Sequence, residues 1–139
     1  MVKSFRHVGK IAAVAIATAV LAAVPTRVGS ERLAMLDTLQ PGQWQLRLRE
    51  PGAGPQRICI PNGRTFIQLR HQSDVCDRFV VGESAAEVTV QYTCRGRGYG
   101  RTRIRRETAT LVQIDSQGIA DSLPFEFRAE ARRIGPCGL

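Results

Sequence analysis

The chain has 139 residues, a length typical of one domain. Hydrophobic residues make up 43% of it and charged residues 23%, a composition that argues against global disorder, a collagen-like repeat and a multi-span membrane protein. The formal net charge is +8. The only two lysines lie within the first ten residues, so every basic side chain after them, histidine aside, is an arginine.

The N-terminus has the pattern of an export signal. Lys3, Arg6 and Lys10 precede residues 11–24, a run of 14 in which only Thr18 is polar. This run is shorter than the roughly 20 apolar residues that a transmembrane helix needs. We therefore predict a signal peptide over residues 1–22, cleaved after Ala22, and a periplasmic or extracellular location. The alternative is a retained anchor.

Residues 23–38 follow the leader and precede the domain, which we expect over residues 39–139. Because this lead-in is only mildly helical, we expect it to be flexible. The domain begins with a Pro41-Gly42 turn. A first strand follows, in which Trp44, Leu46 and Leu48 alternate with polar residues. A second short strand is predicted over residues 57–60, and Asn62 is expected to cap a helical turn that ends near His71.

Every later element is predicted to be a strand, over residues 77–81, 87–94, 101–114 and 123–133. Short polar turns join these strands without crossover helices, which is typical of an antiparallel meander. The predicted fold is therefore mainly β: a curved antiparallel meander sheet with one short helix and two disulfides. With so little helix to cover it, the sheet is expected to curl around its own apolar face.

The four cysteines all follow the leader: Cys59, Cys76, Cys94 and Cys137. An even count in a small exported chain predicts two disulfides, with three possible connectivities. The spacing contains no C-x-x-C, and His71 is the only histidine after the leader, so we predict no metal site and no cofactor.

Strand alternation ranks the three connectivities. If Phe79 and Val81 share the core face with Val88 and Val90, Cys76 points away from Cys94. On this argument the favoured bridges are Cys59 with Cys76 and Cys94 with Cys137.

The order of these features resembles a family of small exported bacterial proteins known as domain of unknown function 3617. The resemblance covers roughly residues 39 to 137. It rests on the leader, the order of the cysteines, the Pro41-Gly42-Gln43-Trp44 entry into the first strand and the terminal Ile134-Gly135-Pro136-Cys137. Arg133 departs from the larger apolar or aromatic residue that the family favours before its final turn. The resemblance implies a periplasmic or secreted location and a β-rich fold, and it implies no catalytic residues.

Six arginines interleaved with glycines occupy twelve residues: Arg95, Arg97, Arg101, Arg103, Arg105 and Arg106. Guanidinium groups bind carboxylates and phosphates in bidentate fashion, and glycines expose backbone N–H groups to anions. The first five of these arginines are the candidate anion-binding residues. On a strand, Arg101, Arg103 and Arg105 share one face, opposite Ile104, and form a basic stripe. The alternative is an ordinary solvated surface, with Glu126 and Glu130 on the final strand as cross-strand partners of the stripe.

The expected ligand of this face is anionic lipid, lipopolysaccharide or an acidic glycan. Arg-Gly segments also bind RNA, but the predicted export argues against a nucleic-acid partner. The sequence predicts no oligomeric state.

No catalytic motif is present, so we predict a non-enzymatic binding or envelope-associated module. His71 and Asp74 are interpreted as a surface helix terminus. A small envelope hydrolase stays as the alternative, and it requires Asp77 or Glu107 to lie in a pocket beside His71.

Overall fold

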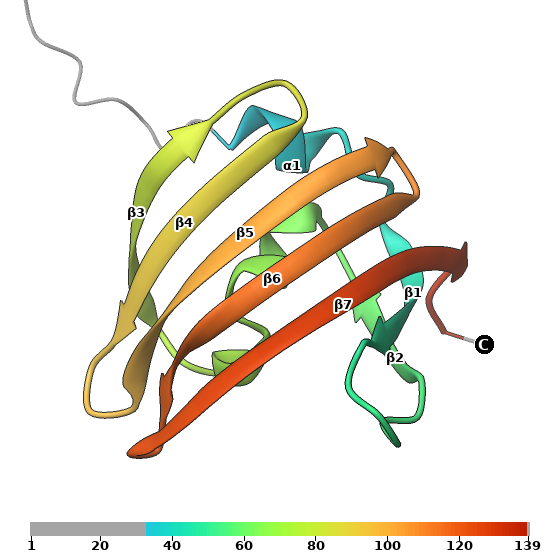
Figure 1. Cartoon of the computed structure of the whole chain (residues 1–139). Helices are drawn as coiled ribbons and strands as arrows, with labels where there is room; N and C mark the ends of the chain where they lie inside the picture. The colour runs from blue at the N-terminus through green and yellow to red at the C-terminus, as the bar shows by residue number, and fades with distance from the viewer. Residues whose placement is uncertain (1–32, 139) are drawn as a thin grey trace, which may run out of the picture.

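The structure is a computed structural model that describes residues 33–138. It is a single seven-stranded sheet with two short helices (Figure 1). The elements have the bounds α1 Ala34–Asp37, β1 Gly42–Leu48, β2 Gln56–Ile60, η1 Gly63–His71 (a 3-10 helix), β3 Cys76–Glu83, β4 Glu87–Cys94, β5 Gly98–Thr108, β6 Leu111–Ala120 and β7 Leu123–Gly135.

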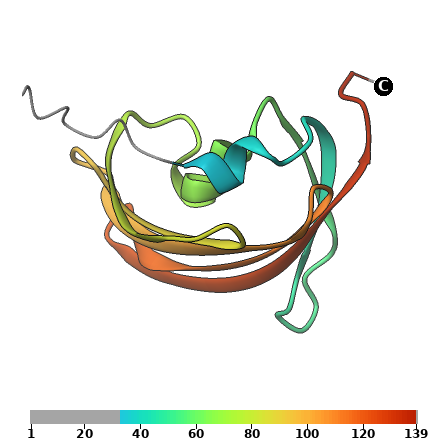
Figure 2. The ribbon, with the colours of Figure 1, turned by 90° about the horizontal axis from the view of Figure 1, so that it is seen from above.

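The sheet has the strand order β2-β1-β7-β6-β5-β4-β3, and every neighbouring pair is antiparallel. Strands β3 to β7 are consecutive neighbours, which confirms the predicted meander, and the β1–β2 hairpin extends the sheet beside β7. The sheet does not close, so β2 and β3 are its edges. It bends into a trough that holds both helices in its hollow, as predicted for a sheet that curls around its apolar face (Figure 2).

The concave face of the trough carries the hydrophobic core. Alternate strand residues point into it, because successive side chains of a strand face opposite sides. Helix η1 covers this face with Phe66 and Ile67, both fully buried, and the Phe66 ring packs edge-on against Trp44 with 5.2 Å between ring centroids. The largest fully buried strand residues are Trp44, Tyr92, Ile60, Ile104, Ile114, Val88, Val90 and Val112.

Polar contacts position η1 in the trough. The predicted cap is confirmed, because the Asn62 side chain accepts a hydrogen bond of 2.9 Å from the Arg64 backbone N–H. At the other end the Gln68 amide donates to the His71 and Asp74 carbonyls at 2.8 and 2.9 Å. The Gln68 oxygen accepts from Arg78 of β3 at 2.7 Å. These bonds fasten the C-terminal end of η1 to the edge of the sheet.

The segment before β1 packs into the core as far back as it is described. Leu33, Met35, Leu36 and Leu39 are all buried, so the packed domain begins earlier than the expected boundary at residue 39. The predicted signal peptide and residues 23–32 lie outside the described residues. Within residues 33–138, no helix has the length and apolar character that a bilayer crossing requires.

The strand predicted over residues 101–114 is in fact two strands. β5 and β6 meet in a tight turn at Ala109 and Thr110. This turn lacks the Gly, Pro, Asn or Asp that usually marks one, and instead the Thr108 hydroxyl accepts a hydrogen bond of 3.1 Å from the Thr110 N–H. The sequence prediction therefore missed the turn and the second half of β6.

The favoured disulfide pairing is also wrong, because the bridges join Cys76 to Cys94 and Cys59 to Cys137. Cys76 lies directly opposite Cys94 in the β3–β4 register, whereas Phe79 is 69% exposed on the other face. An edge strand can carry apolar residues on its outer face, so Phe79 and Val81 did not mark the core side. The second bridge follows from Gln43, which pairs with Cys59 on one side and with Gly135 on the other.

Candidate functional site

The arginine-rich segment divides between a turn and a strand. Arg101, Arg103 and Arg105 alternate along β5 with the fully buried Thr102 and Ile104. Their side chains therefore share one face, as predicted, and this face is the convex side of the trough. Arg106 shares the opposite side with Ile104, where it lies across from buried Val112 and donates to the Ala85 carbonyl at 3.3 Å.

Arg95 and Arg97 do not join this face, because they lie in the turn between β4 and β5. The Arg97 guanidinium pairs with Asp121 at 3.2 Å and with Asp74 at 3.7 Å. Arg95 is exposed and has no acidic partner among the described residues. The structure thus separates two of the five candidate anion-binding residues from the other three.

One glycine of this segment, Gly100, serves packing. Gly100 pairs with Tyr92 and Gly118 inside the sheet. A Cβ on Gly100 would overlap the Tyr92 ring. Glycine at this position therefore makes room for a buried tyrosine, which differs from the expected exposure of backbone N–H groups to an anion.

Two of the three arginines of the stripe are already paired within the protein. Arg103 donates to Glu87 of β4 at 2.7 Å, and this bond holds the pKa of the Glu87 carboxyl below its usual range and raises the pKa of Arg103. Arg105 pairs with Glu107 at 3.1 Å. The expected partners Glu126 and Glu130 are wrong, because β6 lies between β5 and β7 and these two carboxylates lie opposite Gln117 and Gln113.

The third arginine of the stripe, Arg101, is unpaired among the described residues, and so are three of its neighbours. Arg101 lies between Gln91 of β4 and Gln117 of β6, and Gln117 lies opposite Glu126 of β7. Within residues 33–138, none of these four side chains takes part in a hydrogen bond or ion pair. Tyr99 lies two residues before Arg101 and is 51% exposed.

These unpaired groups line a shallow groove. One hollow, of about 500 Å³, includes Tyr99, Gln91, Arg101, Gln117 and Glu126. An adjoining hollow of about 480 Å³ shares Arg101, Gln117 and Glu126 and continues past Asp115 and Arg128. The groove therefore runs across β5, β6 and β7, with hydrogen-bond donors and acceptors along it and an aromatic ring at one end.

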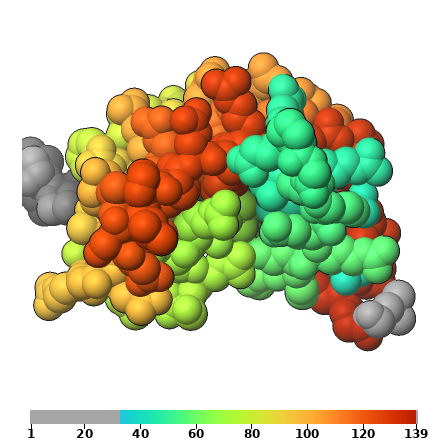
Figure 3. Space-filling model, turned by 60° about the horizontal axis from the view of Figure 1, so that its bottom comes forward, coloured from blue at the N-terminus to red at the C-terminus, as the bar shows by residue number. Residues whose placement is uncertain are grey.

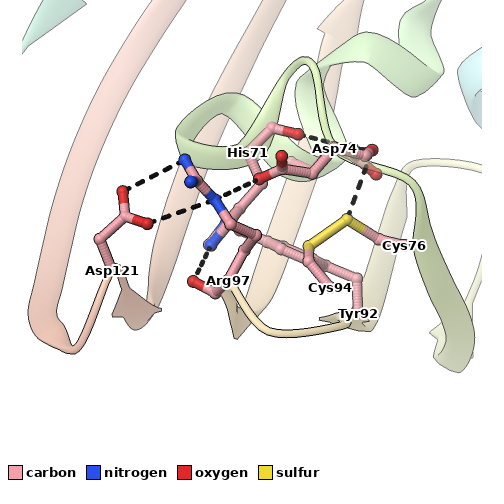
Figure 4. A network of polar contacts seen from close by, with 8 residues as sticks. His71, Asp74, Cys76, Tyr92, Cys94, Arg97 and Asp121 are labelled. Atoms are coloured by element: carbon pink, nitrogen blue, oxygen red, sulfur yellow. Dashed lines mark hydrogen bonds and ion pairs between the residues drawn. A yellow bond between two sulfur atoms is a disulfide. The ribbon is translucent and has the colours of Figure 1, made fainter.

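A separate polar cluster surrounds His71 (Figure 4). His71 is only 3% exposed, with Nδ1 3.2 Å from the Tyr92 hydroxyl and Nε2 3.2 Å from the Arg97 carbonyl oxygen. The interpretation of His71 as a surface helix terminus is therefore wrong. Burial raises the pKa of Tyr92 to about 12, against a smaller opposing effect of Arg70, so this hydroxyl stays protonated at neutral pH.

The contacts of His71 connect η1 to β4 and to the turn after it, which is a structural role. The ligand atoms of His71, Asp74 and Cys94 lie within 4.8 Å of one another. The Cys94 sulfur, however, is bonded to Cys76, so in the oxidised protein only two of the three residues could offer a metal a free ligand atom. Asp77 is exposed opposite Thr93, and Glu107 lies beside Arg105 on the convex face. The hydrolase alternative requires one of these two carboxylates in a pocket beside His71, and neither lies there.

Comparisons of the chain with protein-family models, curated proteins and solved structures found no match.

Proposed function

We propose that the protein is a non-enzymatic binding module of the cell envelope that holds an acidic glycan in the convex groove, centred on Arg101. The observation that carries this proposal is the set of four adjacent polar side chains without internal partners: Gln91, Arg101, Gln117 and Glu126. Polar groups left unpaired on a folded surface are available to a ligand at no cost in broken internal bonds.

The chemistry of the groove favours a sugar chain. Guanidinium binds a carboxylate in bidentate fashion. Amide side chains both donate and accept hydrogen bonds, as sugar hydroxyls require, and an exposed ring such as Tyr99 offers an apolar surface with a polar tip. The length of the groove across three strands favours a polymer over a single small molecule.

The same face is poorly suited to a bilayer. An anionic membrane surface attracts clusters of basic residues, whereas here Arg103 and Arg128 are neutralised by Glu87 and Asp115. Two disulfides and the predicted signal peptide support an oxidising compartment outside the cytoplasm. The resemblance to domain of unknown function 3617 supports the same location.

The test is binding of the mature protein to polygalacturonate, with neutral dextran and phosphatidylglycerol vesicles as comparison ligands. We expect binding to polygalacturonate at low salt that weakens as salt rises, because exposed charges are screened over about 8 Å at physiological ionic strength. Arg101→Gln should weaken it about tenfold or more, the effect of losing a charged hydrogen bond. Tyr99→Ala should weaken it as well.

The matched control is Arg103→Gln on the same strand face. Its guanidinium is already held by Glu87, so the loss should be smaller than for Arg101→Gln, and thermal unfolding should show that both variants fold. Equal effects of the two substitutions would assign binding to net charge alone. Stronger binding to the vesicles than to polygalacturonate would overturn the glycan proposal in favour of a lipid surface.

A further inference from the structure

A separate hollow lies on the opposite side of the sheet from the convex groove, at one end of the trough (Figure 3). It is a crevice of about 150 Å³ with an apolar floor and a polar rim. The crevice exists because the sheet does not close: β2 is an edge strand, and η1, not another strand, completes the wall beside it. Its apolar lining is Leu46 and Leu48 of β1, Ile58 of β2, Leu69 of η1 and Phe127 of β7.

The rim of this crevice is polar and cationic. Arg57 and Gln56 of β2 and Arg70 and Gln72 of η1 line it, and none of the nine lining residues is acidic. The guanidinium carbon of Arg70 lies 5.4 Å from the centroid of the Phe127 ring. Within residues 33–138 Arg70 has no acidic partner and no hydrogen bond from its side chain. An unpaired cation therefore lies over an apolar floor.

We propose that this crevice binds a free fatty acid of medium chain length, with the carboxylate on Arg70 and the acyl chain against Phe127, Leu69 and Ile58. A concave site with an apolar lining and a few placed polar groups is the usual form of a small-molecule site. The charge complements an anion, and the apolar lining complements a hydrocarbon. This site is independent of the convex groove, which carries a different ligand on the other face of the sheet.

The volume limits the length of the chain. A hollow of 150 Å³ has room for about five water-sized groups, since water occupies about 30 Å³ in the liquid. A methylene group is of similar size, so the five carbons of hexanoate beyond its carboxylate fit, and the ends of octanoate and of longer chains stay in solvent. Affinity should rise about fourfold for each methylene that becomes buried, and it should level off beyond hexanoate.

The experiment is calorimetric titration of the mature protein with butanoate, hexanoate, octanoate and dodecanoate, each below its micelle concentration. Octanol and octylamine are the head-group comparisons. We expect octanoate to bind at least tenfold more tightly than octylamine, because the cationic rim repels an ammonium group. Arg70→Gln should reduce octanoate affinity about tenfold, and octanol affinity much less.

Two further variants separate this site from general effects. Arg95→Gln removes an exposed arginine far along the chain from the crevice and should leave octanoate binding unchanged. Leu48→Trp should fill the crevice and abolish binding of both octanoate and octanol, and circular dichroism should show whether the variant folds. The proposal is overturned by equal binding of octanoate and octylamine, by affinity that keeps rising to dodecanoate, or by equal losses in Arg70→Gln and Arg95→Gln.

Discussion

The two faces of strand β5 differ in burial, although both belong to the same eleven residues. The concave side chains, Thr102 and Ile104, are fully buried under η1. The convex ones, Arg101, Arg103 and Arg105, are exposed, and only the last two are ion-paired. The concave face therefore supplies most of the stability of the fold, whereas the convex face contributes little to stability and is available for binding.

The largest effect is expected from the disulfide on the outer side of the trough. Cys59→Ser with Cys137→Ser opens a loop of 78 residues and should destabilise the protein by about 4.5 kcal/mol in the chain-entropy model. The inward bridge, Cys76 with Cys94, closes only 18 residues and should cost about 3 kcal/mol on the same basis. Urea unfolding of both double variants measures the two values. A larger loss for the inward pair would show that burial outweighs loop length.

The next largest effect is expected from shortening a core side chain of η1, the helix in the trough. Phe66→Ala removes a fully buried ring packed against Trp44 and should lower the free energy of unfolding by about 3 to 5 kcal/mol. Trp44 is the only tryptophan, so its fluorescence reports the change directly. A loss below about 1 kcal/mol, the range of surface changes, would contradict the assignment of the core to this face.

A polar contact inside the concave face should have an intermediate effect. The Thr102 hydroxyl donates to the Ile67 carbonyl at 2.6 Å and lies 2.8 Å from the Ser116 hydroxyl. Thr102→Val keeps the side-chain shape but leaves the Ile67 carbonyl and the Ser116 hydroxyl without this partner. It should lower the free energy of unfolding by about 1 to 3 kcal/mol. Adding Ser116→Ala should restore part of this loss, because it removes one orphaned group. Denaturant titration of the single and double variants decides this.

The smallest effect belongs to an ion pair on the convex face. Glu87→Gln removes the partner of Arg103, and exposed pairs of this kind contribute little. The folded-state pKa of Glu87 lies below its ordinary value, so its contribution is present above the unfolded pKa and is lost as pH falls through the folded pKa. Thermal unfolding of wild type and variant should therefore differ slightly at pH 7 and converge in acid. A difference that grows in acid would reverse the assigned sign.

Strands with clean alternation and the helix cap were predictable. Trp44, Leu46 and Leu48 alternate with polar residues in β1, and Asn62 marks the start of η1. Both signals are local, because period-two patterns and side-chain caps involve only residues near one another in the chain. The turn at Ala109 was not predictable, since a threonine hydroxyl replaces the usual turn residue. The burial of His71 was not predictable either, because its neighbours Tyr92 and Arg97 come from distant positions in the chain.

The candidate site shows the same division. The sequence by itself determined that Arg101, Arg103 and Arg105 share one face, because alternation along a strand is a local property. Only the tertiary structure decided that Arg103 faces Glu87, that Arg101 has no partner, and that Gln117 and Glu126 lie beside it. Strand order and register decide these neighbours, and they depend on the packing of the whole sheet around η1.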